Sequence, residues 1–403
     1  MIIAEINTLA HGSTGKIMLA LADVARKNGE TVYTYSAKNY RRTGRKTYSP
    51  IDGHTYYAGE FSNILHKCFA QATGLNGCGS ILPTVKLIQK MKQEHVELIH
   101  LHNLHEFCIN IPLLFRYIKK NKIKVVWTLH DCWAFTGHCT HFTMVKCNKW
   151  KTGCGGCSQL REYPISYMDT TAFMWKKKKA WFTGVDKLEI VTPSEWLASL
   201  VRQSYLGEYN VHVIHNGIDL STFCPTESNF KEKKNIRDKF VLLGVAFEWD
   251  KRKGLDVFIE LSHRLEAERF QIVLIGTDEA VDSKLPDNII SIHRTHNQRE
   301  LAEIYSAADL FVNPTREDNY PTVNMEAIAC GTPVLTFKTG GSPEIVDDST
   351  GIVVDCDDVD AIEEQIRKCE ESMLFEKSNC VEKAKEFDQK LRFMEYVELY
   401  KEL

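Results

Sequence analysis

The sequence lacks any long hydrophobic segment. No stretch of its 403 residues approaches the ~20 consecutive apolar residues that a membrane-spanning helix needs. The apolar run at residues 2–6 is too short, and its flanks are too polar, for a secretory signal. We therefore expect a cytoplasmic protein, and any contact with a membrane is then peripheral, at the cytoplasmic face.

A strong net charge and the common cofactor fingerprints are also missing. The formal net charge is −3, so no global field favours nucleic acid as a partner. The glycine-rich loop Gly12-Ser-Thr-Gly15-Lys16 is followed by Ile17, where a P-loop needs Ser or Thr, and the dinucleotide fingerprint G-x-G-x-x-G is absent. An NAD-dependent dehydrogenase is therefore disfavoured, and no tightly bound organic cofactor is expected.

The chain does contain an alternation of short apolar strands and helical segments. Its length exceeds the roughly 250–300 residues at which a single core stops growing. Short β-branched runs separated by helices predict parallel sheets that are covered on both faces. We expect strands at 2–6, 31–36, 96–102, 124–130, 189–192 and 211–215 and, after a charged linker at 225–239, at 240–246, 271–276, 309–313 and 332–337.

These two series predict an α/β protein of two doubly wound, Rossmann-like domains. The first domain covers residues 1–220, with a cysteine-rich insertion at 132–157, and the second covers 221–388. A final helix at 389–403 is expected to pack back on the first domain. Ligands of such sheets bind at the carboxyl ends of the strands, and two domains that face each other would form one deep cleft.

The strongest functional signal lies in the second domain. A predicted strand ends at Pro314, an acidic loop with Glu317 and Asp318 follows, and a helix that carries Glu326 then begins. Carboxylates accept charge-assisted hydrogen bonds from sugar and ribose hydroxyls, and the N–H groups at the start of a helix suit a phosphate. The alternative is an acidic helix cap followed by a core helix.

Two further loops of this domain suit a diphosphate. Arg252 and Lys253 precede a predicted helix, and a cation there would stabilise the charge that develops on a diphosphate leaving group. The stretch Thr339-Gly-Gly-Ser-Pro-Glu344 contains two glycines that let the backbone approach a ligand closely. A solvated basic turn and a plain glycine turn are the alternatives.

Together these motifs resemble those of the retaining glycosyltransferases of family 4, which have the two-domain GT-B fold. The segment from Asp318 to Glu326 is similar to the family's E-x7-E element with Asp in place of the first Glu, and the Ala-Cys-Gly-Thr-Pro-Val that follows fits closely. Lys253 matches the Lys that the family carries before Gly. The family's Arg a few residues upstream has no counterpart, and Arg252 could replace it.

The resemblance implies a nucleotide-diphosphate sugar as the donor substrate. Asp318, with Glu317 as a rival, would contact the donor sugar, and Glu326 the ribose. Lys253 and Arg252 would hold the diphosphate. The remaining residues of the predicted donor site are Gly12, Gly15, Gly340, Gly341 and Glu344.

In the first domain, His130 ends a predicted strand, at the edge where ligands are expected. The resemblance places this histidine beside the reacting sugar, and a buried structural histidine is the alternative. The predicted catalytic set is His130, Lys253, Asp318 and Glu326. The predicted acceptor-side residues, at a neighbouring strand end, are His100, His102 and Asn103.

The chain has 13 cysteines, and five of them lie between Cys132 and Cys157. Four of the five could hold a structural zinc ion in tetrahedral geometry; they are Cys139, Cys147, Cys154 and Cys157. Packed thiols or a redox pair are the alternatives. The insertion resembles that of a bacterial subgroup of the family found among exopolysaccharide and colanic acid gene products.

Four lysines flanked by aromatic residues, Trp175-Lys-Lys-Lys-Lys-Ala-Trp181, lie in a helical stretch. They could rest on an anionic inner-membrane surface, where a lipid-linked acceptor is found, or form an ordinary solvated helix face.

We therefore predict a retaining hexosyltransferase. It moves a sugar from a nucleotide-diphosphate donor to a saccharide or lipid-linked saccharide acceptor in surface polysaccharide biosynthesis. The alternatives are a nucleotide-sugar epimerase of the same fold and a non-catalytic sugar-binding scaffold.

Overall fold

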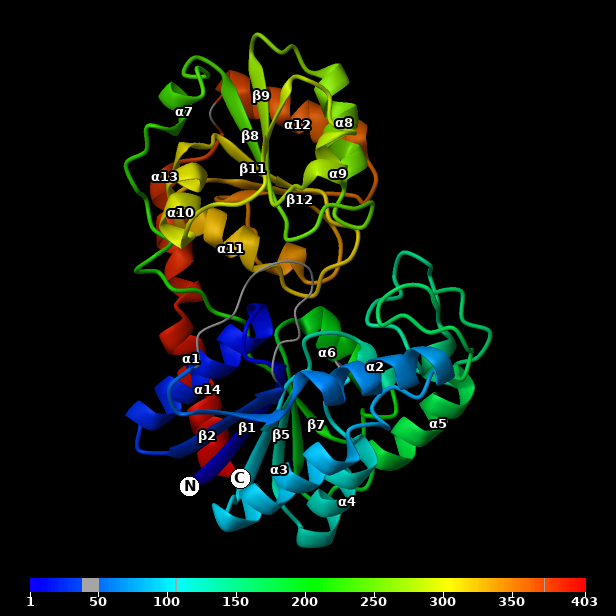
Figure 1. Cartoon of the computed structure of the whole chain (residues 1–403). Coiled ribbons are helices and arrows are strands. Elements are labelled where there is room, and N and C mark those ends of the chain that lie inside the picture. Colours follow the sequence, from blue (N-terminus) through cyan, green and yellow to red (C-terminus); the bar gives the residue numbers. More distant parts are fainter. Residues whose placement is uncertain (38–50, 106, 373) are drawn as a thin grey trace. The chain divides into compact units, whose positions relative to one another are not determined.

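The computed structural model describes residues 1–37, 51–105, 107–372 and 374–403, and it divides into two units (Figure 1). Unit 1 comprises Met1–Ile214 together with Phe393–Leu403, and unit 2 comprises His215–Arg392. The division falls slightly before the boundary that was predicted after residue 220. No helix within the described ranges combines the length and the apolar character needed to cross a bilayer.

Unit 1 is built on a seven-stranded sheet whose registered strand pairs are all parallel, in the order β3-β2-β1-β4-β5-β6-β7. Its strands are β1 (Ile2–Leu9), β2 (Thr31–Ala37), β3 (His54–Ala58), β4 (Leu98–Leu101), β5 (Lys124–Thr128), β6 (Leu188–Thr192) and β7 (Asn210–Val213). Its α-helices are α1 (Ser13–Lys27), α2 (Glu60–Thr73), α3 (Ile81–Gln93), α4 (Ile111–Asn121), α5 (Thr171–Phe182) and α6 (Glu195–Arg202), with short 3-10 turns at Trp133–Phe135 and Lys149–Lys151.

Unit 2 is built on a six-stranded parallel sheet in the order β10-β9-β8-β11-β12-β13. Its strands are β8 (Phe240–Val245), β9 (Phe270–Ile275), β10 (Ile289–Ile292), β11 (Leu310–Asn313), β12 (Val334–Phe337) and β13 (Gly351–Val354). Its helices are α7 (Phe230–Lys233), α8 (Leu255–Arg264), α9 (Glu279–Asp282), α10 (Gln298–Ala307), α11 (Thr322–Ala329), α12 (Val359–Ser372) and α13 (Lys377–Ala384), with 3-10 turns at Ser342–Glu344 and Lys385–Phe387. Two doubly wound α/β sheets are therefore confirmed.

Alternate residues of each strand pack on opposite faces, as the twofold period of a strand requires. In β4, Ile99 belongs to the core cluster that contains α3 and α4, whereas Leu98 belongs to the cluster on the other face. That second cluster includes Phe393 and Tyr400 of the C-terminal helix α14 (Gln389–Glu402). The end of the chain therefore covers one face of the unit 1 sheet.

Each sheet reverses its strand order once, and these reversals locate the candidate sites. In unit 1 the chain winds outward from β1 in one direction and from β4 in the other, and in unit 2 the same occurs at β8 and β11. Loops at the carboxyl ends of such neighbouring strands diverge to opposite faces and leave a crevice. The predicted donor-site loops follow β1, β8, β11 and β12.

Candidate functional site

Lys253 and Asp318 meet at the point where the unit 2 sheet reverses. Lys253 ends the loop between β8 and α8, and Asp318 lies in the loop after β11. Their Nζ and Oδ2 atoms are 2.5 Å apart, and the two side chains are 21% and 24% exposed. The structure therefore brings together a cation and a carboxylate that the sequence separates by a whole βαβαβ series, and both remain accessible to a ligand.

The start of α8 approaches the end of β11 because residue 254 is glycine. Gly254 has φ of 77°, and a Cβ atom there would lie 2.4 Å from the carbonyl oxygen of Pro314. Asp250 accepts a hydrogen bond from the backbone N–H of Lys253 at 2.8 Å. Arg252 donates from its guanidinium to the carbonyl oxygen of Glu317 at 3.4 Å. The cation that contacts the Asp318 carboxylate is therefore Lys253 and not Arg252.

The glycine loop after β12 packs against the backbone of Asp318. Gly340 has φ of 54°, and a Cβ atom there would lie 1.7 Å from the carbonyl oxygen of Asp318. The N–H of Gly341 donates to the carbonyl of Asn319 at 2.8 Å, and the N–H of Asn319 donates to Oδ1 of Asp318 at 2.8 Å. Three loops thus fix the backbone around Asp318, and a side chain at position 340 would force them apart.

The remaining acidic candidates differ in burial and partners. Glu317 is only 4% exposed, so Asp318 is the member of that pair that offers a surface to a ligand. Glu326 lies in α11 and accepts a hydrogen bond from the hydroxyl of Tyr305 on α10 at 3.2 Å. Burial and the nearby Glu326 carboxylate raise the pKa of Tyr305 well above its usual value, so the tyrosine stays protonated and holds the carboxylate. Glu344 ends the 3-10 turn that follows the glycine loop.

In unit 1 the glycine loop after β1 is tied to the loop after β4. Gly12 has φ of 110° at the start of α1, and a Cβ atom on Gly15 would lie 2.5 Å from the backbone of Ala10. The side chain of Asn7 donates to Thr14 Oγ1 at 3.1 Å and accepts from the N–H of Asn103 at 3.1 Å. Our prediction did not include Asn7, although this polar residue directly follows the predicted strand at 2–6, where ligands are expected.

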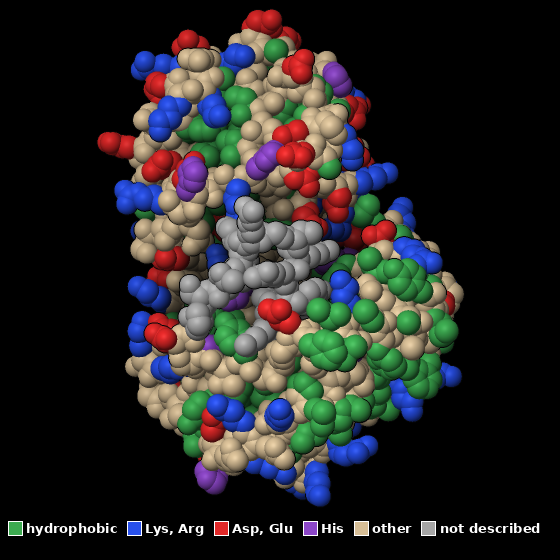
Figure 2. Space-filling model, in the orientation of Figure 1, with side chains coloured by type: hydrophobic (Ala, Val, Ile, Leu, Met, Phe, Trp, Pro, Cys, Tyr) green, Lys and Arg blue, Asp and Glu red, His purple; other side chains and the backbone are tan. Residues whose placement is uncertain are grey.

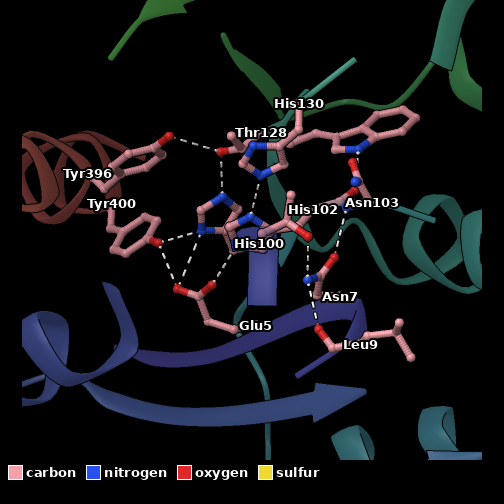
Figure 3. A network of polar contacts seen from close by, with 12 residues as sticks. Glu5, Asn7, Leu9, His100, His102, Asn103, Thr128, His130, Tyr396 and Tyr400 are labelled. Atoms are coloured by element: carbon pink, nitrogen blue, oxygen red, sulfur yellow. Dashed lines mark hydrogen bonds and ion pairs between the residues drawn. The ribbon is translucent and has the colours of Figure 1, made fainter. Parts of the chain in front are cut away.

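A network of buried polar side chains lies at the carboxyl ends of β1, β4 and β5 (Figure 3). Glu5 is fully buried, and its Oε2 lies 2.9 Å from Nε2 of His102. Nδ1 of His102 lies 3.1 Å from Nε2 of His130. Tyr400, from the C-terminal helix, donates its hydroxyl to Oε1 of Glu5 at 3.0 Å. A carboxylate, two imidazoles and a tyrosine from four separate segments therefore form one connected chain.

The hydrogen bonds of this network assign the ring protons. An ionised carboxylate only accepts hydrogen bonds, so Nε2 of His102 carries a proton and its Nδ1 is an acceptor. Nε2 of His130 must then donate, which leaves Nδ1 of His130 as the acceptor nitrogen. Burial raises the pKa of Glu5, but contacts with His100 and His102 outweigh it and hold the pKa at about 2. Burial, reinforced by His102, lowers the pKa of His130 to about 3, so this imidazole is neutral at physiological pH.

The prediction that His100 and His102 contact an acceptor is not supported by their positions. His100 is 0% exposed and His102 is 1% exposed. The ring nitrogens of His100 lie 2.6 Å from the hydroxyl of Tyr400 and 2.8 Å from that of Thr128. Both histidines therefore lie behind His130, which is half-buried.

The spacing of the cysteine sulfurs does not support the predicted zinc site. Cys139, Cys147, Cys154 and Cys157 line one cavity of about 310 Å³. Among the residues that the structure describes, however, the only His, Cys, Asp or Glu set with three ligand atoms within 4.8 Å of one another is Glu5, His100 and His102. Each member of that set already has a hydrogen-bonding partner in the network, so no ion is needed to explain it. Burial raises the pKa of the Cys139 thiol to about 12, as expected for a packed thiol.

The lysine run of α5 is not a uniform solvated face. Lys178 is completely buried, donates to the carbonyl of Trp133 and lies over its ring. Burial lowers the pKa of Lys178 to about 7. Trp175 is also buried and donates to the carbonyl of Trp150 at 2.8 Å. Only the exposed lysines of the run, such as Lys176 and Lys177, can meet a membrane.

The neutral histidines predict a loss of stability in acid. The pKa of His102 is lowered from 6.5 to about 4 and that of His130 to about 3, so below pH 6.5 the unfolded chain takes up protons that the folded chain does not. The free energy of unfolding should therefore fall as the pH drops from 6.5 to 4. Thermal unfolding across this range measures the fall, and His130→Asn should make it shallower. An unfolding temperature that stays constant down to pH 4 would contradict these burial-driven shifts.

Comparison with known proteins places the chain among sugar-transferring enzymes. The family model "Glycosyltransferase Family 4" matches residues 48–222, and "Glycosyl transferases group 1" matches residues 226–387. A protein described as a colanic acid biosynthesis glycosyl transferase, WcaC of Escherichia coli strain K12, is 25% identical over 87% of this chain and 86% of its own length.

Solved structures agree with this placement at the level of the fold. The sucrose-phosphate synthase of Thermosynechococcus elongatus matches with a TM-score of 0.69 and 18% identity, over 100% of this chain and 98% of that one. Anabaena HepE in complex with UDP-glucose matches with a TM-score of 0.67 and 14% identity over the whole of both chains. Both likenesses are similarities of architecture.

Proposed function

We propose that this chain, which is a glycosyltransferase with the GT-B fold, transfers a sugar from a nucleotide-diphosphate donor to a hydroxyl of a saccharide or lipid-linked saccharide. The transfer retains the anomeric configuration and serves the synthesis of a surface polysaccharide. The observation that carries the proposal is the accessible Lys253–Asp318 pair at the strand reversal of unit 2. The UDP-glucose complex of Anabaena HepE supports the donor class, and the similarity to WcaC supports the product class.

In the proposed reaction Lys253 binds the diphosphate of the donor. Negative charge grows on this group as the glycosidic bond breaks, and a fixed cation in a partly desolvated site lowers the energy of that transition state. In the free protein Asp318 holds the ammonium group in place. When the donor enters, phosphate oxygens join the lysine, and the Asp318 carboxylate accepts a hydrogen bond from a hydroxyl of the sugar.

Glu326 is proposed to hold the ribose. A carboxylate can accept two hydroxyls at once, which suits the neighbouring hydroxyls of a ribose. The hydrogen bond from Tyr305 fixes the carboxylate before the donor arrives, so less side-chain freedom is lost on binding. The N–H groups at the start of α11, next to Pro321, add a positive end for phosphate.

His130 is proposed to orient the reacting sugar rather than to remove a proton. Its depressed pKa makes it a poor base, because little driving force remains for accepting a proton at neutral pH. Its Nδ1 accepts a hydrogen bond from a sugar hydroxyl instead. The proton of the acceptor then passes to an oxygen of the leaving diphosphate, on the face from which the donor departs, which is consistent with retention.

A panel of nucleotide sugars tests the donor class directly. The unfolding temperature should rise with one nucleotide sugar, since a ligand at a hundred times its Kd stabilises a protein by ~2.7 kcal/mol. Release of the nucleoside diphosphate should then depend on an added saccharide acceptor, and the anomeric proton couplings of the product should match those of the donor. An epimerase would release a free sugar without an acceptor. If no nucleotide sugar shifts the unfolding temperature or is turned over, the proposal is wrong.

A further inference from the structure

Large apolar side chains are exposed together on one part of unit 1. Figure 2 shows hydrophobic side chains gathered where α2, α3 and α5 lie. Phe61 on α2 is 75% exposed and Leu82 on α3 is 74% exposed. We define the apolar face by six exposed side chains, namely Phe61, Leu65, Phe69, Leu82, Tyr167 and Phe173. Soluble proteins rarely leave such contiguous apolar surface without a function.

The helix α2 has its apolar stripe on the outside. Phe61, Leu65 and Phe69 recur every four residues and are all exposed, whereas the buried positions between them include Asn63 and His66. A helix packed only on its own protein turns its apolar stripe to the core. Since α2 does the reverse, its outer face is suited to an apolar environment outside the protein.

The polar inner face of α2 is held in place by specific hydrogen bonds. Nδ1 of His66 lies 2.9 Å from the hydroxyl of Ser80, which precedes α3, and Nε2 accepts the N–H of Gly79 at 3.0 Å. Burial lowers the pKa of His66 to about 4, so the ring is a neutral hydrogen-bonding group. These bonds fix the rotation of α2 about its axis and keep its apolar stripe turned outward.

The three elements of the apolar face are joined into one surface. The loop at Ser80 links α2 to the start of α3, and the N–H of Tyr167 donates to the carbonyl of Gln71 near the end of α2 at 2.8 Å. A Cβ atom on Gly74 would lie 2.2 Å from the hydroxyl of Thr170, so the chain before α5 packs directly on the end of α2. The exposed residues of this segment therefore extend the surface of α2.

Cations lie directly on the rings of this face. The guanidinium of Arg161 is 4.7 Å from the ring centroid of Tyr167, and Nζ of Lys177 is 5.2 Å from that of Phe173. Lys86, on α3, and Lys176, on α5, are also exposed. A second copy of this chain would set these cations against one another, whereas an anionic lipid surface offers headgroups to the cations and acyl chains to the rings.

We propose that the apolar face docks on an anionic lipid bilayer, with α2 lying in the plane of the interface. Phe61, Leu65 and Leu82 enter the acyl boundary, and Arg161, Lys176 and Lys177 stay at the level of the phosphates. This inference rests on the proposed function only in that a lipid-linked acceptor would be met at the same surface. Binding to the bilayer itself requires neither donor nor acceptor.

Vesicle flotation tests the docking with the whole protein. The protein should float with vesicles that contain phosphatidylglycerol and bind much less to vesicles of phosphatidylcholine alone. The double substitution F61D/L65D should lower the partition coefficient at least tenfold, because two apolar contacts are lost and two anions are added. K176Q/K177Q should weaken the preference for the anionic lipid, since Arg161 keeps its charge. The control L391D changes another exposed leucine, outside the apolar face, and should float like the wild type.

The outcomes separate docking from catalysis. Both aspartates occupy exposed positions, so circular dichroism and donor turnover with a water-soluble acceptor should match the wild type. The docking proposal is overturned if the wild-type protein does not float with either vesicle, or if F61D/L65D floats as well as L391D. It is also overturned if the protein is a dimer that F61D/L65D converts to a monomer, since the face would then bind a second copy. Absence of donor turnover in the wild type would instead count against the proposed function and would leave the docking result unchanged.

Discussion

Replacing Lys253 with methionine is expected to lower kcat about 10²–10³-fold, the usual loss when one fixed group that stabilises transition-state charge is removed. Methionine keeps the length of the aliphatic stem but cannot neutralise the diphosphate. Because Lys253 and Asp318 are both partly exposed, losing their ion pair should cost no more than about 1 kcal/mol of folding stability. Steady-state release of nucleoside diphosphate, with thermal unfolding of the same sample, measures both effects.

The matched control for Lys253 lies two residues earlier. Lys251 is exposed and sits in the same basic turn, so Lys251→Met removes the same charge from the same loop without removing the group that faces Asp318. It should leave kcat within about twofold of the wild type, since a solvated charge is largely screened. If kcat falls equally in the two variants, Lys253 acts only through the general attraction of this basic loop for anions. Wild-type rates in Lys253→Met would remove the site assignment.

The parts of this site that could be predicted from the sequence are those that depend on local order. Lys253, Asp318 and Gly340 each lie in the loop that follows a strand of one parallel sheet, and the carboxyl ends of such strands meet at one edge. Recognising the strands was therefore enough to predict that their loops converge. Gly340 was predicted to let the backbone approach a ligand; in the structure it lies against the backbone of Asp318, and its approach to a ligand stays a prediction.

The network behind His130 could not be predicted in the same way. Tyr400 and Glu5 lie at opposite ends of the sequence, and their hydrogen bond depends on how α14 packs. His100 lies in β4 and His102 directly follows the strand, so both were predicted to be available at a strand end. The twofold period of a strand, however, cannot show which face of the sheet a second helix will cover. Because α14 covers that face, the two histidines became internal.

Weak or ambiguous patterns account for the other differences. The strands β3, β10 and β13 were not predicted, and all three are edge strands, which are short and need less apolar sequence than central strands. The cysteine spacing was compatible with a metal, yet spacing along a chain leaves the distances between sulfurs undetermined. The lysine run looked solvated because its one-letter pattern does not reveal that Lys178 lies on the ring of Trp133.

The network also explains how the far end of the chain can influence His130. Tyr400 donates to Glu5, Glu5 accepts from His102, and His102 accepts from His130. Each step fixes the proton of the next ring, so the tautomer of His130 depends on a carboxylate that no substrate touches. Glu5 is therefore a positioning residue, and its removal should alter the chemistry of His130 as well as the stability of unit 1.

Replacing Glu5 with glutamine is expected to destabilise the protein by about 1–3 kcal/mol, because the buried donors of His102 and Tyr400 lose their ionised acceptor. The amide of glutamine must present an N–H group to Tyr400 or to His102, both of which now donate to the carboxylate. If the new N–H group faces Nε2 of His102, that nitrogen must become an acceptor, and the ring proton of His102 moves to Nδ1. Two N–H groups, from His102 Nδ1 and His130 Nε2, would then point at each other. The tautomer of His130 must then reverse, and kcat should fall by more than KM changes, since ground-state binding depends mainly on unit 2.

The carboxylate–histidine pair of Glu189 and His212 provides the control. Its atoms lie 2.7 Å apart, but the histidine is 37% exposed, so water can replace the bond and Glu189→Gln should cost less than about 1 kcal/mol. Denaturant unfolding compares the two variants, and ¹⁵N spectra of the histidine rings report the tautomers. If Glu5→Gln lowers stability but leaves the His130 tautomer and kcat as they are in the wild type, the network is only structural. A reversed His130 tautomer with a lower kcat and an unchanged KM would instead show that the hydrogen bonds from Tyr400 through Glu5 and His102 set the tautomer on which His130 depends.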